Sequence, residues 1–193
     1  VLKDKLADLI RQASLSRLVI HANAHQAEIR AIDSGFRPGR MLASHMVFIL
    51  VSSDTLRLTF KVHFSVRTAR NLAFGIFGGE SPADISERQA IDYFKEYGNL
   101  VAGNVITLLG QAGIELGISL PMATRGFYEV FSDYTERQHR ILTFSDFWGL
   151  HVDGRDVFCS TQFEIMDKNK LACIAGHDFA EGRIDDDEEL DFL

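Results

Sequence analysis

Apolar residues recur along this chain with two periods, one typical of helices and one typical of strands. The longest helical pattern covers residues 84–113, where small or apolar positions three or four apart form one stripe: Ile91, Phe94, Gly98, Val101, Val105 and Leu108. Asp84 or Ser86 can cap its start, and Ser86 and Gln89 have the spacing of a capping box. Gly110 and Gly113 offer stopping points at its end. The pattern predicts one long amphipathic helix.

Several shorter segments predict strands. Residues 46–52 form an apolar run that suits a buried strand, and residues 17–32 are rich in β-forming residues. Residues 115–120 predict a further strand that ends at Pro121. The clearest signal lies in residues 55–64, whose strict alternation places five apolar side chains on one face: Leu56, Leu58, Phe60, Val62 and Phe64.

Residues 139–166 predict a β-hairpin about Asp153-Gly154, a strong two-residue turn signal. The register that this turn imposes pairs apolar residues with each other on one face: Leu150 with Val157, Trp148 with Cys159, Phe144 with Phe163 and Leu142 with Ile165. Asp146 opposite Thr161 is the polar exception on that face.

Two further helices complete the expected order of elements. Residues 2–13 place leucines on one helical face, and Ser65 can cap a short helix that stops at Gly78-Gly79. The order is then a helix, three strands, a helix, the long helix and more strands. We expect an α/β fold in which the long helix and shorter helices pack on a mainly antiparallel sheet.

Composition and charge narrow the class of protein. The chain has 193 residues, 46% of them hydrophobic and 24% charged, which suits one domain or one domain with an extension. The formal charge of −7, without basic clusters, argues against nucleic acid and anionic membranes as partners. No apolar run approaches the roughly 20 residues of a membrane span, and the N-terminus is a charged amphipathic helix rather than a signal peptide. We expect a cytoplasmic protein in which Cys159 and Cys173 are free thiols.

Familiar catalytic and metal-binding patterns are missing. His21 and His25 have a metal-like spacing for a helix, but they fall in an expected strand without a neighbouring cysteine or carboxylate cluster. The sequence has no Gly-x-Ser-x-Gly motif, no phosphate loop and no dinucleotide-binding fingerprint. We therefore expect no metal site and no cofactor of its own.

The long helix carries a second stripe, which holds the candidate chemistry. At about 100° per residue, four residues lie roughly opposite the apolar stripe: Asp92, Glu96, Asn99 and Gly103. Asparagine is a poor residue in mid-helix, and each of the helix's three glycines costs about 1 kcal/mol relative to alanine. A solvated helix face also carries such residues, so the stripe alone does not establish a function.

At this helix the sequence resembles the CheC/CheX/FliY family of chemotaxis phosphatases. The family motif is Asp or Ser, three residues, Glu, two residues and Asn, followed by a Pro after about 22 residues. Asp92, Glu96 and Asn99 match it, and Pro121 follows after 21 intervening residues, one short of the family spacing. A second Glu-x-x-Asn helix is absent from the sequence, so the resemblance is closest to the single-site CheX branch. It covers residues 1–166 and leaves 167–193 as an extension, whose acidic end we interpret as a solvated tail, with a docking peptide as the alternative.

The resemblance implies hydrolysis of the aspartyl phosphate of a CheY-type response regulator, in chemotaxis or related two-component signalling. In that reaction Asn99 would orient the attacking water, and Glu96 would pair with a lysine of the receiver domain. Asp92 and Gly103 would belong to the partner-binding surface, where Gly103 permits close approach. The receiver would supply Mg²⁺, and the resemblance further implies a homodimer joined at sheet edges.

Two alternatives remain open on the sequence alone. A non-enzymatic adaptor for a receiver domain or a flagellar-switch component would keep this helix without turning over phosphate. A structural dimer module would leave the Glu-x-x-Asn face merely solvated. Phosphate release from a phosphorylated receiver with magnesium separates them.

Overall fold

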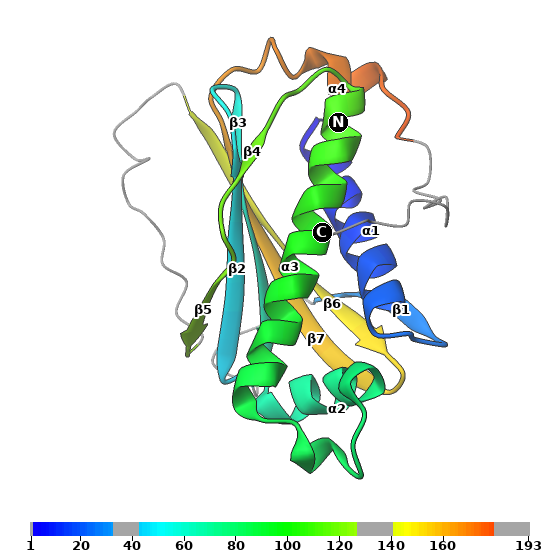
Figure 1. The fold of residues 1–193 in the computed structure, drawn as a ribbon. Coiled ribbons are helices and arrows are strands. Elements are labelled where there is room, and N and C mark those ends of the chain that lie inside the picture. The colour runs from blue at the N-terminus through cyan, green and yellow to red at the C-terminus, as the bar shows by residue number, and fades with distance from the viewer. Residues whose placement is uncertain (1, 33–42, 127–140, 180–193) are drawn as a thin grey trace, which may run out of the picture.

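A seven-stranded antiparallel sheet forms the frame of the molecule, and helices α1 and α3 lie side by side across one of its faces (Figure 1). The computed structural model describes residues 2–32, 43–126 and 141–179. The helices are α1 (Leu2–His21), α2 (Val66–Phe77), the 3₁₀ turn η2 (Pro82–Asp84), α3 (Glu87–Gln111) and α4 (Ala172–Gly176). The strands are β1 (Ala27–Ala31), β2 (His45–Ser52), β3 (Leu56–Phe64), β4 (Gly117–Ile118), β5 (Met122–Arg125), β6 (Leu142–Val152) and β7 (Arg155–Ile165). The strand order is β1-β6-β7-β3-β2-β4, with β5 also paired to β2, and this confirms the predicted fold class.

The β6–β7 hairpin confirms the predicted turn and register. Asp153 and Gly154 have φ angles of 44° and 77°, the left-handed pair that a tight hairpin turn requires. Every predicted apolar pair is present, from Leu150 opposite Val157 to Leu142 opposite Ile165. The hairpin therefore places an apolar face against the helices, with Asp146 opposite Thr161 within it.

Strand β3 confirms the predicted alternation, and β2 is the strand predicted from the apolar run over residues 46–52. The five predicted side chains of β3, from Leu56 to Phe64, are each at most 1% exposed. Lys61 and His63 on the other face of β3 are also buried, at 3% and 2% exposure. Alternation therefore identified which side chains face the helices, although the second face of β3 is also buried at Lys61 and His63, while Arg57 on that face is exposed.

The N-terminal region differs from the sequence prediction. Helix α1 continues to His21, so the strand expected over residues 17–32 is reduced to β1, Ala27–Ala31. Ser14 and Leu18 continue the buried stripe of α1 at helical spacing. The packing of this stripe outweighs the local β propensity of the segment.

The strand expected over residues 115–120 is also shorter than predicted. Only β4, Gly117–Ile118, pairs with β2 there, and β5 begins after Pro121. Proline has no N–H to donate to a ladder, so it separates the two short edge strands. The structure thus adds β5, which the sequence reading did not include.

The helix ends follow from local capping. Ser86 and Gln89 form the predicted capping box of α3, with Gln89 N donating to Ser86 Oγ at 3.2 Å and Ser86 N donating to Gln89 Oε1 at 2.9 Å. Ser65 Oγ likewise accepts from Thr68 N at 3.0 Å, and α2 ends at Gly78 with φ of 68°. These ends fix where α3 begins relative to the sheet.

The described part of the C-terminal extension packs on the domain. Leu171 and Ile174, at helix α4, are fully buried in the core. Lys5 Nζ of α1 donates to Ala175 O at 2.7 Å and to His177 O at 3.2 Å. The boundary that we place at residue 166 remains a prediction, and the acidic tail lies outside the described residues.

Cys159 and Cys173 are free thiols, as predicted.

Candidate functional site

Helix α3 is seated on the sheet by the apolar stripe that its sequence predicts. Its buried side includes Phe94, Val101 and Val105, and Ile91 and Leu108 lie at the edges of the stripe, half-buried. The Phe94 ring stacks on Phe64 of β3 with centroids 4.1 Å apart. At Gly98 an added Cβ would lie 3.7 Å from Val47 Cγ1, an ordinary van der Waals distance, so this turn of the helix packs directly over β2.

A buried polar network joins α3 to α1 and the sheet. Tyr97 is fully buried and its hydroxyl donates to Ser14 O of α1 at 2.9 Å. Trp148 Nε1 of β6 donates to Ser14 Oγ at 3.0 Å. Because Tyr97 directly follows Glu96, this network fixes the rotation of the helix at the candidate site.

The four candidate residues lie together on the side of α3 that faces away from the sheet. Asp92, Glu96 and Gly103 are exposed, and Asn99 is half-buried. The helical spacing places the Glu96 carboxylate and the Asn99 carboxamide one turn apart. Space is open beyond Gly103, because a Cβ built there meets no atom within 4 Å. A partner can therefore approach this side of the helix closely.

The two carboxylates of the stripe have different surroundings. Asp92 pairs with two cations of its own helix, Arg88 Nε at 3.7 Å and Lys95 Nζ at 3.6 Å. Glu96 makes no ion pair with any residue in the described ranges of the chain. Its carboxylate is thus the one that is open to a cation brought by a partner.

His21 borders this surface, whereas the sequence analysis considered it only as half of a metal-like histidine pair in an expected strand. Its Nε2 donates to Tyr93 O at 3.0 Å, and its ring lies on the Tyr93 ring with centroids 4.2 Å apart. Burial lowers the pKa of His21, while the hydrogen bond to Tyr93 O and the charge of Glu96 act in the opposite direction. The sequence carried a signal for this placement, because His21 continues the helical spacing of the buried residues Ser14 and Leu18.

Metal ligands do not gather at this surface. His21 ends α1, whereas His25 lies in the exposed connection to β1, so the helical metal spacing of the pair is not realised. Among the residues that the structure describes, no three His, Cys, Asp or Glu side chains form a group that could hold a metal ion. No helix in the described ranges is long and apolar enough to cross a membrane.

The Pro121 of the motif lies away from the regular part of α3. It stands between β4 and β5 at the sheet edge and is half-buried. The motif therefore spans a helix and the adjacent edge of the sheet, which meet along one side of the molecule (Figure 1).

Comparison with solved structures shows the fold of this chain in chemotaxis proteins. A CheX from Vibrio vulnificus matches with a TM-score of 0.60 and 13% identity, covering 81% of this chain and 94% of that one. A CheC-like protein from Shewanella oneidensis MR-1 matches with a TM-score of 0.62 and 16% identity, covering 82% and 97%. A CheX–CheY–BeF3–Mg²⁺ complex from Borrelia burgdorferi matches with a TM-score of 0.58 and 16% identity, covering 81% and 96%.

Comparison of the sequence itself identifies the family. No curated protein matches the chain significantly. The family model described as "Chemotaxis phosphatase CheX" matches residues 46–145, just over half of the chain. That range contains the whole Asp92–Gly103 stripe and Pro121. This chain belongs to the CheX family of chemotaxis phosphatases.

Proposed function

We propose that the chain hydrolyses the aspartyl phosphate of a CheY-type receiver domain through Glu96 and Asn99. The observation that carries this proposal is the placement of these two side chains, one turn apart on the outward side of a rigidly seated helix, in a chain of the CheX family. The Borrelia complex, whose fold this chain shares, contains a CheY with Mg²⁺, which supports a receiver as the partner and as the source of the metal.

Asn99 suits the positioning that this reaction needs. Phosphoryl transfer passes through a loose transition state, so catalysis depends on alignment and electrostatics more than on a strong base. A carboxamide oxygen accepts a hydrogen bond from water and can hold that water in line with the phosphorus. Asn99 would therefore orient the attacking water, while the receiver and its Mg²⁺ hold the phosphoryl group.

Glu96 suits docking. Its carboxylate is exposed and has no cationic partner within the described residues, so a lysine beside the receiver's phosphoaspartate can pair with it. Asp92 and Gly103 extend the contact surface, and Gly103 lets the receiver backbone approach the helix. The docked pair would set the depth at which Asn99 enters the receiver's active site.

The direct test mixes the protein with a phosphorylated CheY-type receiver and Mg²⁺ and follows release of inorganic phosphate. Release should exceed the receiver's own autohydrolysis, and Glu96→Ala should weaken both binding and rate, with a salt-dependent effect. Binding of the receiver without acceleration of phosphate release would replace this proposal with the adaptor function. Absence of both would leave only the structural dimer module.

We also propose that the chain forms a homodimer through a sheet edge. The edges of the described sheet are β1 on one side and the short strands β4 and β5 on the other. Unpaired edge groups are a template for pairing between subunits. Light scattering at micromolar concentration should give twice the mass of 21.7 kDa, and a monomer would contradict this.

A further inference from the structure

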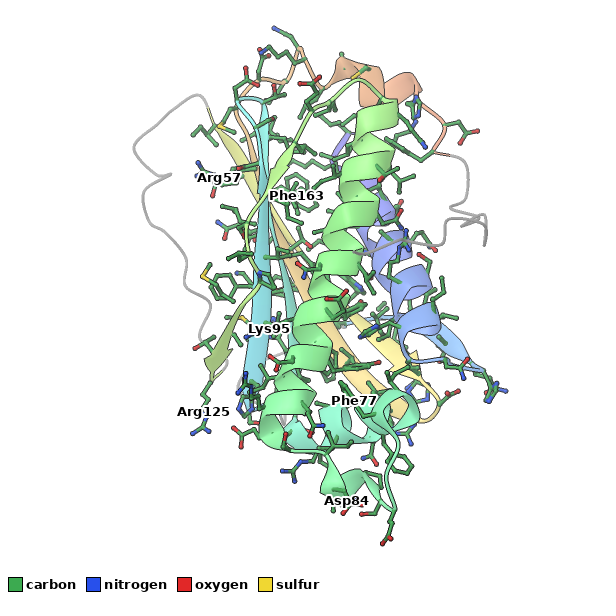
Figure 2. All side chains as sticks on the ribbon, in the orientation of Figure 1. Arg57, Phe77, Asp84, Lys95, Arg125 and Phe163 are labelled. Carbon is green, nitrogen blue, oxygen red and sulfur yellow. The ribbon has the colours of Figure 1, made fainter. Side chains whose placement is uncertain are left out.

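Lys95 is a cation on the same side of α3 as the candidate site, and neither the family motif nor the proposed roles use it. It lies four residues before Asn99, so the two side chains are neighbours on the helix surface, with Cα atoms about 6 Å apart along the axis. Figure 2 labels Lys95 on the lower half of α3. Its side chain is 36% exposed and its Nζ lies 3.6 Å from Asp92 Oδ1.

We propose that Lys95 contacts the phosphoryl oxygens of the docked receiver and stabilises the charge that spreads over them during hydrolysis. This inference rests on the proposed function, because Asn99 defines where the phosphorus lies. The side chains of an α-helix lean toward its N-terminus. The Asn99 carboxamide therefore covers the turn from which Lys95 projects, and an anionic group held against Asn99 is within reach of the ammonium.

The ion pair with Asp92 is weak enough for Lys95 to leave it and bind a phosphoryl group instead. Both groups are partly exposed and their separation is 3.6 Å, so the ion pair adds little to the stability of the free protein. A phosphoryl group carries more charge than one carboxylate and can displace Asp92 at small cost. Asp92, also paired with Arg88, remains neutralised after Lys95 moves.

The negative charge of the stripe also favours a cation beside the phosphoryl group. Asp92 and Glu96 are both negative, and a phosphoryl group brought against them is repelled unless positive charge offsets theirs. Glu96 would be matched by the receiver's lysine. During phosphoryl transfer, cations stabilise the negative charge on the equatorial oxygens of the transferred group. Their loss therefore lowers the rate of the chemical step.

Arg88 provides a matched control within the same helix. It pairs with the same Asp92 carboxylate at 3.7 Å, but it lies eleven residues from Asn99, about 16 Å along the axis. A role limited to neutralising Asp92 would give Arg88→Gln and Lys95→Gln the same phenotype. A role at the phosphoryl group belongs to Lys95 alone.

The experiment measures two quantities: the rate of phosphate release at a saturating concentration of phosphorylated receiver, and the affinity for the unphosphorylated receiver. The variants are Lys95→Gln, Lys95→Arg, Arg88→Gln and Asn99→Ala. Lys95→Gln should lower kcat by about tenfold or more and change the affinity for the unphosphorylated receiver by no more than about twofold. Lys95→Arg should recover part of the rate. Arg88→Gln should match wild type.

Equal losses in Lys95→Gln and Arg88→Gln, or wild-type kcat in Lys95→Gln, would overturn the inference. If Asn99→Ala is inactive while Lys95→Gln turns over normally, only this inference fails. If wild type releases no phosphate beyond autohydrolysis, the proposed function fails first and takes this one with it.

Discussion

Two buried tyrosines lie one turn apart on α3, and loss of the hydroxyl group should lower the free energy of unfolding at Tyr97 but not at Tyr93. Tyr97 is fully buried, and its hydroxyl donates to Ser14 O at 2.9 Å. Tyr93 is 2% exposed, and its hydroxyl is buried with no hydrogen-bond partner among the described residues. Tyr→Phe removes the same atom at both sites, so the difference isolates the hydrogen bond.

The magnitudes follow from that difference. Tyr97→Phe loses one buried hydrogen bond and should lower the free energy of unfolding by about 1–2 kcal/mol. Tyr93→Phe removes a buried polar group that gains nothing from its surroundings, so its free energy of unfolding should stay the same or rise by up to about 1 kcal/mol. For a chain of this size 1 kcal/mol shifts Tm by roughly 2–4 °C.

Urea denaturation followed by fluorescence measures both changes. The chain has one tryptophan, Trp148, which is buried and bonded to Ser14, so its emission reports on this part of the core. Unchanged m values would show that the compactness of the unfolded state is the same in all three proteins. Equal destabilisation by the two substitutions, or a larger loss in Tyr93→Phe, would refute the assignment of these hydrogen bonds.

Two further predictions concern other parts of the fold. Arg11 Nε and Nη2 donate to the two oxygens of Asp146 at 2.7 and 2.5 Å, so a double-mutant cycle with alanine at both positions should give a coupling of about 1 kcal/mol, and zero coupling would contradict it. Burial lowers the pKa of His63 from 6.5 to about 4. Between these values the unfolded chain binds a proton that the folded chain does not, so stability falls as pH falls, by about 3 kcal/mol at the lower end. His63→Gln should flatten urea-derived stability between pH 6.5 and 4, and an unchanged slope would count against this.

The sequence predicted correctly those helices and strands whose capping, turn and periodic residues favour the same structure that their packing requires. The α3 capping box at Ser86 and the hairpin turn at Asp153-Gly154 are short-range features, and both have the predicted geometry. Once the turn is set, the pairing from Val152 to Leu142 follows from the two-residue period of the strands. The exposed stripe from Asp92 to Gly103 is likewise a consequence of helical period.

The remaining features depend on contacts between distant segments. β-forming residues after Arg17 favoured a strand, but packing of Leu18 and His21 extends α1 instead. Asp146 on an apolar face was unexplained until α1 supplied Arg11 as its partner. The ion pairs that separate Asp92 from Glu96, by contrast, follow helical spacing, because Arg88 and Lys95 lie four residues before and three residues after Asp92 and no cation lies three or four residues from Glu96.

The role of Asn99 is the central claim, and phosphate-release kinetics of Asn99→Ala test it most directly. Loss of one group that positions the attacking water should cost about 3 kcal/mol of barrier, roughly a hundredfold in kcat. Affinity for the receiver should remain close to that of wild type, and the fold should be retained, because Asn99 lies on the outward side of α3. Wild-type turnover in Asn99→Ala would contradict the account and favour the adaptor function.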